Sequence, residues 1–204
     1  PVILQQEDFE EVYDRVMDDQ LKGGTGIYGV FWDPEKLGGL GDIALSRVDV
    51  LNLYWESGIT DLQQSRNLFY LRMEDNDRLL EAYPQLEGKL TGELDAGQKP
   101  QTEDRVDTTD KSTVIDWYYK KSQQGRSVLH YCKFVGDTVL FATENSPDYR
   151  DRGWYDHGLY PFIMDPLFRT AGSPCGFGYI DVGKSAQEYV DRGNQAILQN
   201  MLAN

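Results

Sequence analysis

Residues 113–143 read Thr-Val-Ile-Asp-Trp-Tyr-Tyr-Lys-Lys-Ser-Gln-Gln-Gly-Arg-Ser-Val-Leu-His-Tyr-Cys-Lys-Phe-Val-Gly-Asp-Thr-Val-Leu-Phe-Ala-Thr. Runs rich in β-branched and aromatic residues, separated by polar and glycine-containing turns, are typical of β-strands. The pattern predicts three antiparallel strands, at Thr113–Tyr119, Ser127–Val135 and Thr138–Thr143. The Gly136-Asp137 pair predicts a tight hairpin between the last two strands. This stretch therefore indicates an antiparallel sheet.

The chain before this stretch begins with a predicted helix at Gln6–Lys22, whose apolar residues recur at three- and four-residue spacings and which ends at Gly23-Gly24. Strand patterns and turn residues follow it. The predicted strands are Gly26–Trp32, Ile43–Val48, Leu51–Trp55 and Asn67–Met73. A short helix is expected from about Asn76 to Tyr83, stopping at Pro84.

Residues 86–111 differ from the rest, because they carry seven acidic side chains, no aromatic residue and few aliphatic ones. Such a composition predicts a long, mobile loop. After it, Leu159–Met164 could add a strand, and Ser185-Ala-Gln-Glu188 is a capping-box pattern that predicts the start of a C-terminal helix. That helix is still apolar at Leu202, so we expect it to continue further or to pack on the core. The fold class is α+β: a mainly antiparallel sheet flanked by an N-terminal and a C-terminal helix.

The length of 204 residues predicts a single domain over 1–204, and a start at Pro1 without methionine predicts a piece of a longer protein. A net charge of −14 argues against a surface that grips nucleic acid or acidic lipid. Two cysteines do not make a disulfide scaffold. The sequence contains no signal peptide or membrane-spanning run, so we expect a cytosolic protein.

Residues 24–29, Gly-Thr-Gly-Ile-Tyr-Gly, match the dinucleotide-binding pattern G-x-G-x-x-G. That site needs a strand before the glycines and a helix after them. The predicted order here is the reverse, so the pattern indicates a helix stop followed by a closely packed strand. The soft metal ligands His130, Cys132, His157 and Cys175 lack the spacing of a zinc site, and no metal or cofactor is expected. We interpret His130 as a core or cross-strand histidine and the cysteines as buried free thiols.

Residues 151–162, Asp-Arg-Gly-Trp-Tyr-Asp-His-Gly-Leu-Tyr-Pro-Phe, concentrate aromatic and charged groups. Asp156 and His157, with Ser146 or Ser173, could form a hydrolase site. Neighbouring Asp and His side chains seldom face each other productively, however, and no G-x-S-x-G nucleophile elbow is present. We therefore favour a rigid aromatic turn in an assembly protein.

A carbohydrate-active hydrolase or a carbohydrate-binding module is the alternative, because 34 acidic residues offer many carboxylate pairs. The residues that could line a sugar groove are Trp32, Trp55, Trp117 and Trp154. Aromatic residues of this kind more often belong to a core or an interface.

Several different short motifs are spread along nearly the whole chain outside the acidic loop. In chain order they are Gly23–Gly26, Val30–Pro34, Gly41–Ile43, Val139–Asn145, Trp154–Gly158, Tyr160–Phe162, Asp165–Phe168 and Gly172–Gly178. In this order the chain resembles the portal proteins of tailed bacteriophages.

The resemblance implies a non-catalytic, portal wing-like subunit of a ring, usually a dodecamer, at one capsid vertex. Double-stranded DNA is packaged and ejected through such a ring, which belongs to the virion and assembles in the host cytoplasm. The implied partners are the terminase, capsid and scaffold proteins and head–tail adaptors, with no membrane. Because the family's proteins are longer, we expect a wing fragment that ends near or before the stem helices and does not close a ring alone.

No catalytic, metal-binding or cofactor-binding residue is expected. The candidates for structural or oligomer-interface roles are Trp154, Tyr155, Asp156, His157, Tyr160, Pro161, Phe162, Trp32 and Asp33. Gly153, Gly158 and Pro161 are expected to fix the backbone of a turn that positions the C-terminal helix or lines a subunit contact.

Overall fold

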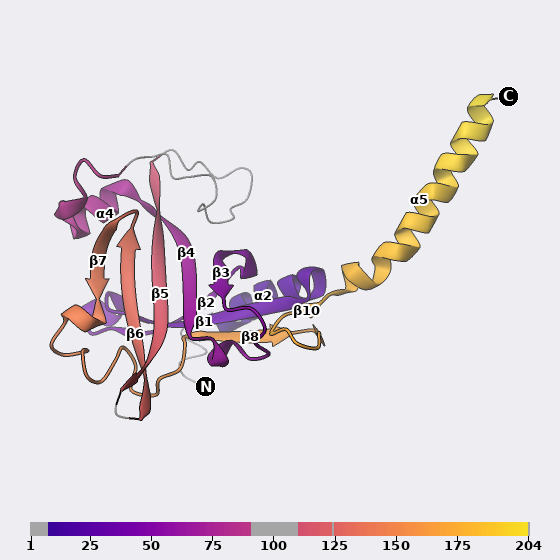
Figure 1. Cartoon of the computed structure of the whole chain (residues 1–204). Coiled ribbons are helices and arrows are strands. Elements are labelled where there is room, and N and C mark those ends of the chain that lie inside the picture. The colour runs from indigo at the N-terminus through magenta and orange to yellow at the C-terminus, as the bar shows by residue number, and fades with distance from the viewer. Residues whose placement is uncertain (1–7, 91–109, 124, 204) are drawn as a thin grey trace. The chain divides into compact units, whose positions relative to one another are not determined.

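The computed structural model describes residues 8–90, 110–123 and 125–203, which form two compact units (Figure 1). The first unit comprises the described residues up to Arg47 and those from Phe162 onward, and the second runs from Val48 to Pro161. Antiparallel strands and N- and C-terminal helices confirm the predicted α+β class. Whether the units act as the single domain predicted from the length stays a prediction.

The N-terminal helix, α2 (Phe9–Gly23), is amphipathic: Val16 and Gln20 are buried one turn apart, while its acidic residues other than the half-buried Asp19 are exposed. Gly24 ends the helix with a left-handed backbone (φ 83°), and its N–H donates to the Gln20 carbonyl at 2.9 Å. The predicted helix is confirmed over the described residues, whereas its expected start at Gln6 lies outside them.

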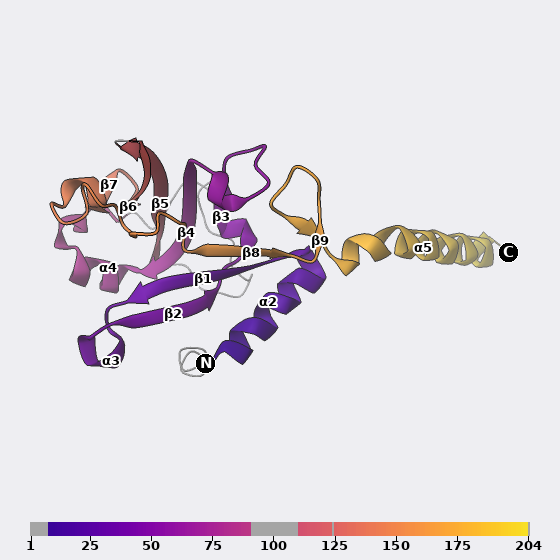
Figure 2. The same cartoon turned by 90° about the horizontal axis from the view of Figure 1, so that it is seen from below.

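The strand β1 (Thr25–Asp33) follows α2 and is central in a three-stranded antiparallel sheet of order β2-β1-β8 (Figure 2). Its neighbours are β2 (Asp42–Arg47) and β8 (Phe162–Pro166), so β8 begins three residues later than predicted. A helix thus precedes the glycine motif and a strand follows it, as the sequence indicates. A Cβ atom at Gly26 would lie 2.4 Å from Cγ1 of Val16, so glycine here permits the close packing of α2 on β1.

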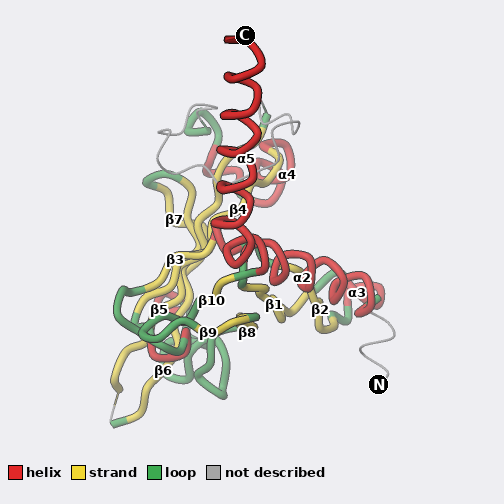
Figure 3. The backbone as a smooth tube through the Cα atoms, turned by 90° about the vertical axis from the view of Figure 1, so that its right-hand side faces the viewer, coloured by secondary structure: helices red, strands yellow, loops and turns green. Residues whose placement is uncertain are grey.

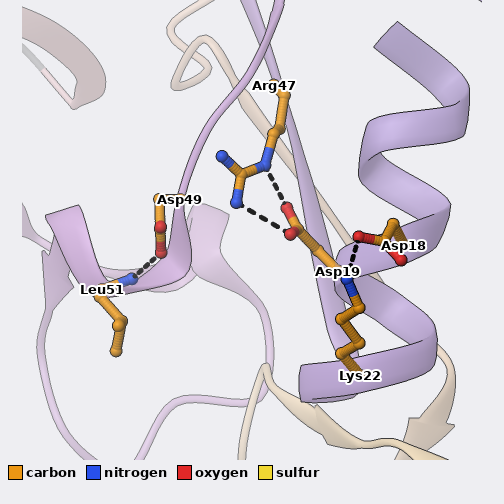
Figure 4. Close-up of polar contacts among 6 residues, drawn as sticks. All are labelled: Asp18, Asp19, Lys22, Arg47, Asp49 and Leu51. Atoms are coloured by element: carbon orange, nitrogen blue, oxygen red, sulfur yellow. Dashed lines mark hydrogen bonds and ion pairs between the residues drawn. The ribbon is translucent and has the colours of Figure 1, made fainter. Parts of the chain in front are cut away.

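Two polar contacts hold α2 against this sheet. The Arg47 guanidinium, at the end of β2, contacts both carboxylate oxygens of Asp19, at 2.5 and 2.8 Å (Figure 4). Nε2 of Gln20 donates to the Asp165 carbonyl of β8 at 2.8 Å. Because a two-pronged Arg–carboxylate pair fixes orientation as well as distance, it sets the position of α2 along the hairpin.

The second unit is built on a five-stranded antiparallel sheet of order β3-β4-β5-β6-β7 (Figure 1). The strands are β3 (Leu53–Trp55), β4 (Asn67–Asp75), β5 (Lys111–Gln123), β6 (Arg126–Val135) and β7 (Thr138–Ala142). Each strand pairs with the next one in the chain, which makes the sheet a meander. The three strands predicted within residues 113–143 are therefore confirmed.

The predicted strand Leu51–Trp55 is too long, because Val50–Asn52 form a 3-10 turn instead. The Asp49 carboxylate caps this turn by accepting a hydrogen bond from the Leu51 N–H at 2.9 Å (Figure 4). An aspartate that bonds the backbone two residues on favours a turn over an extended strand.

The short helix α4 (Asn76–Ala82) matches the predicted one to within a residue and is followed by a 3-10 turn, η3 (Pro84–Leu86). Its Leu79 belongs to a buried cluster whose members come from α4, η3, β5 and β6. They are Leu79, Leu86, Val114 and Val135. The predicted acidic loop begins at Leu86, which this cluster buries, and residues 91–109 of it lie outside the described residues.

The C-terminal part of the chain pairs β9 (Phe168–Arg169) with β10 (Gly176–Phe177) and then forms α5 (Tyr179–Ala203), which Figure 3 shows in red. The predicted start of this helix at Ser185 is wrong, because α5 begins six residues earlier. Asp181, in the first turn, accepts a hydrogen bond from the Gly178 N–H at 3.1 Å, which supports the earlier start. Neither α5 nor any other helix in the described ranges is long and apolar enough to cross a membrane.

Candidate functional site

The aromatic segment predicted to form a rigid turn lies on one face of the five-stranded sheet. Trp154 stacks on Tyr131 of β6, with ring centroids 4.9 Å apart and planes 28° apart. Its other aromatic neighbours are Phe141 of β7, in a T-shaped contact at 5.5 Å, and Tyr149 at 5.2 Å. Contacts of this kind add to the stabilisation that burial of the rings provides. The segment thus covers the sheet of its own unit.

Two glycines set the backbone of this segment. Gly153 has φ 82°, and a Cβ atom there would lie 2.5 Å from the carbonyl oxygen of Leu129. The neighbouring Trp154 N–H donates to that same oxygen at 2.7 Å, so the turn is hydrogen-bonded directly to β6. Gly158 is also left-handed, with φ 65°. A side chain at Gly153 would push the turn away from the sheet.

Asp156 and His157 point to different partners. The exposed Asp156 carboxylate lies 4.0 Å from Nε of Arg152, one turn back in the chain. The His157 ring stacks on Tyr155 at 5.2 Å, and its Nδ1 accepts a hydrogen bond from the Leu159 N–H at 3.0 Å. Since the backbone occupies the ring nitrogen that a catalytic aspartate would hold, this pair lacks the geometry of an Asp–His dyad.

Tyr160 is held by hydrogen bonds from both its side chain and its backbone. Its hydroxyl donates to the Ser65 carbonyl at 2.7 Å. The Gln63 side chain contacts both backbone groups of Tyr160, accepting from its N–H at 2.8 Å and donating to its carbonyl at 3.2 Å. Nζ of Lys120 lies 4.4 Å from the ring centroid. Burial raises the pKa of Tyr160, so its hydroxyl stays protonated and remains a donor.

A charged network underlies the aromatic cluster and was not predicted. The Tyr131 hydroxyl donates to the buried Asp116 carboxylate at 2.5 Å, and the second oxygen of Asp116 lies 2.7 Å from Nε of Arg72. Arg72 also pairs with Glu74 at 3.0 Å, and Glu74 lies 3.4 Å from Nζ of Lys133. The network ties β4, β5 and β6 together.

The surroundings of Tyr131 and Arg72 shift the pKa of both groups upward. Burial raises the pKa of Tyr131, and the negative Asp116 raises it further. Burial alone would lower the pKa of Arg72, but Asp116 and Glu74 together raise it above its ordinary value. The phenol therefore stays neutral and the guanidinium stays charged, which suits a structural role. One signal was present in the sequence: a carboxylate between the apolar Ile115 and Trp117 needs a partner when the strand is buried.

Three predicted residues, Phe162, Trp32 and Asp33, lie in the first unit. Phe162 is buried and meets Phe31 of β1 in a T-shaped contact at 5.5 Å, so it belongs to the core of the three-stranded sheet. Trp32 is exposed at the end of β1. The Asp33 carboxylate accepts a hydrogen bond from the Glu35 N–H at 2.9 Å. The buried Pro161 is the last residue of the second unit.

His130 is confirmed as a core histidine, fully buried on β6 and stacked on Tyr119 at 5.5 Å. Its Nδ1 lies 3.1 Å from the Thr143 hydroxyl and its Nε2 lies 3.3 Å from the Gln123 amide. Both cysteines are free; Cys132 is buried and Cys175 is half-buried. Within the described ranges, no group of three or more His, Cys, Asp or Glu residues is arranged to hold a metal ion.

The tryptophans do not gather into one groove on the five-stranded sheet. Trp117 stacks on Phe69 at 5.8 Å and contacts Tyr119 at 4.3 Å. In β5 these residues alternate with Tyr118, which lies on the face that Trp154 covers, because Tyr118 contacts Tyr131. Trp117 and Trp154 therefore lie on opposite faces of the sheet.

No protein-family model matches the sequence, and no curated protein is significantly similar to it.

Proposed function

We propose that the chain is part of a portal subunit: a non-catalytic, ring-forming protein through which double-stranded DNA enters and leaves a capsid. The order of motifs that resembles portal proteins supports this proposal. The terminase, capsid, scaffold and head–tail adaptor proteins are then its partners, and the virion is its final location. Two features of the molecule bear on the proposal, namely an unburied helix and the charge.

The observation that carries the proposal is the surface of α5. Every described side chain from Tyr179 to Leu202 is exposed, although apolar residues recur on the helix at three- and four-residue spacings. We call this set the α5 stripe: Val182, Ala186, Tyr189, Val190, Gly193, Ile197 and Met201. Polar residues fill most of the opposite side. An amphipathic helix of 25 residues, about 37 Å long at 1.5 Å per residue, normally buries such a stripe.

A second copy of the chain is the partner that we propose for the α5 stripe. Burial of a large apolar side chain that was fully exposed stabilises an association by roughly 1.5–3 kcal/mol. The side chains of the α5 stripe are only partly exposed, so each contributes less. Leu198 and Leu202, one turn apart, are also exposed and extend the apolar surface beyond the stripe. A helix with a widened apolar surface can contact two neighbours, as repeated copies in a closed ring require.

The charge supports a channel rather than a DNA-gripping protein. With 34 acidic and 20 basic residues, the chain has a net charge of −14. A protein that neutralises DNA phosphates needs clustered Lys and Arg. A channel that must let DNA slide benefits from the opposite balance, because tight binding would stall translocation.

The test is negative-stain electron microscopy of the protein expressed from its full open reading frame. Rings with a central channel are the expected result, together with no retention of a double-stranded DNA fragment in gel-shift experiments at 0.15 M salt. A monomer or small dimer under assembly conditions would overturn the proposal. A panel of glycosides then tests the carbohydrate alternative, in which turnover must depend on a candidate carboxylate such as Asp156.

A further inference from the structure

The tip of the β1–β2 hairpin, residues 32–42, exposes large apolar side chains. We call these residues the hairpin tip; the short helix α3 (Lys36–Gly39) lies within it (Figure 2). Trp32, Leu37 and Leu40 are 56, 61 and 82 % exposed. One exposed leucine needs no explanation, but three large apolar residues on one short loop are typical of a contact site.

The hairpin tip also holds backbone strain. Leu37 is left-handed, with φ 53° and ψ 37°, and Gly38, Gly39 and Gly41 have positive φ as well. A left-handed backbone is unfavourable for a residue other than glycine, because its Cβ atom then lies too close to the following carbonyl oxygen. Leu37 recovers little of this by burial, because most of its side chain faces solvent. Strain that the fold retains without a packing gain is characteristic of binding loops.

Contacts within the hairpin tip hold it in one conformation. The Trp32 ring lies against Gly41, where a Cβ atom would come within 2.5 Å of the ring. The Gly41 N–H donates to the Lys36 carbonyl at 3.0 Å, and Asp33 accepts from the Glu35 N–H at 2.9 Å. A surface ordered before binding loses little entropy when it meets a partner.

The charge of the hairpin tip defines the partner's chemistry. Three carboxylates (Asp33, Glu35 and Asp42) and one ammonium group (Lys36) give it a net charge of −2. We propose that the hairpin tip docks into an apolar pocket rimmed by Lys and Arg on a protein other than this chain. Apolar side chains enter the pocket, and the carboxylates face the basic rim.

A second copy of this chain fits less well as the partner. The densest basic spots of the sequence hold two residues each, Lys120-Lys121 and Arg150 with Arg152. Lys121 is paired with Glu144, and Arg152 lies 4.0 Å from Asp156, so part of this charge is already neutralised. An anionic lipid surface fits no better, because it repels the carboxylates of the hairpin tip.

The experiment rests on the proposed function only for its choice of probes. These are purified terminase, major capsid protein and head–tail adaptor from the same viral genome, tested one by one against the full-length protein by biolayer interferometry. One of them is expected to bind. Leu40→Ser should weaken that binding at least tenfold, and Leu37→Asn should weaken it without loss of thermal stability. Raising NaCl from 0.05 to 0.5 M should also weaken it, since unlike charges attract.

The matched control is Leu51→Ser. Leu51 lies outside the hairpin tip and is 58 % exposed, close to the value for Leu37, so its replacement should leave binding unchanged. The inference is overturned if none of the three probes binds, or if Leu40→Ser and Leu37→Asn bind like the original protein. It is also overturned if these variants keep their binding to the probe protein but lose self-association or binding to phosphatidylglycerol vesicles. Rings are expected from every variant, so their absence from the unaltered protein would count against the proposed function alone.

Discussion

At the scale of single residues, Leu37 offers a direct measure of stored strain. Among the described residues other than glycine, only Asp8 and Leu37 have positive φ. Asparagine adopts the left-handed region more readily than leucine, because its short polar side chain can bond locally. We expect Leu37→Asn to raise the free energy of unfolding by about 0.5–1 kcal/mol. Urea unfolding followed by tryptophan fluorescence measures this change.

The control for that experiment is Leu40→Asn. Leu40 has an ordinary helical backbone, with φ −77°, and its side chain is even more exposed than that of Leu37. The same substitution there removes no strain and should give no gain. An equal gain at both positions would mean that lower surface hydrophobicity, rather than relief of strain, stabilises the variants.

His130 should make the stability of the second unit depend on pH. Burial lowers its pKa; the nearby Lys121 lowers it further, while Glu144 opposes the shift. As pH falls through about 6.5, the ordinary value, the unfolded chain binds a proton before the folded one does. The stability is therefore fully present above this pH and is lost as pH falls toward the folded pKa.

The measurement is urea unfolding between pH 7.5 and 5.5, with and without His130→Gln. The substitution should flatten the dependence of stability on pH across this window. Glu144 does not confuse the result, because its hydrogen bond to Lys121 lowers its pKa and moves its titration to more acidic solutions. An identical slope in both proteins would show that other groups cause the dependence.

At the scale of elements, the segment from Tyr149 to Tyr160 acts as a cover for the five-stranded sheet. Trp154 is its central contact, with aromatic neighbours on both β6 and β7. Because the ring is only partly buried, Trp154→Ala should lower the free energy of unfolding by about 2–3 kcal/mol, less than a fully buried aromatic would. Thermal unfolding followed by circular dichroism gives the value.

Leu159→Ala is the comparison within the same segment, since Leu159 is half exposed and should cost less than about 1 kcal/mol. If Trp154→Ala proved as mild as Leu159→Ala, the aromatic stack would not hold the segment on the sheet. If the Trp154→Ala protein also assembled into the same ring of subunits, the predicted structural role of Trp154 would be wrong.

Local patterns predicted most of these elements. The strands of residues 113–143 are runs of β-branched and aromatic residues between clear turns, so β5, β6 and β7 follow from the sequence. The start of α5 could not be predicted in this way. The residue pattern of a capping box looks the same in the interior of a helix as at its N-terminus. The Arg72–Asp116 pair was also missed. It joins positions 44 residues apart, and strand register is set by packing that a local pattern does not contain.

At the scale of the whole molecule, the predicted site residues divide into two groups. Trp154 to Pro161 belong to the second unit, whereas Phe162, Trp32 and Asp33 belong to the first. Composition alone singled out the aromatic segment, because few twelve-residue stretches hold so many aromatic and charged groups. It could not show that Phe162 is core and Trp32 is surface. That distinction depends on which face of the β2-β1-β8 sheet is covered, and hence on tertiary packing.

The exposed helix α5 gives the prediction that bears most directly on assembly. Ile197 and Met201 lie one turn apart on the α5 stripe and are 58 and 73 % exposed. Replacing both with Asp places two charges where we propose that another copy packs, and should weaken self-association of the full-length protein at least tenfold. Arg192→Asp changes the net charge by the same two units on a side of α5 away from both the α5 stripe and Leu198 with Leu202, and should leave association unchanged. Sedimentation velocity of both variants measures the difference. Equal losses would point to net charge as the cause, and two unaffected proteins would remove the α5 stripe from the assembly interface.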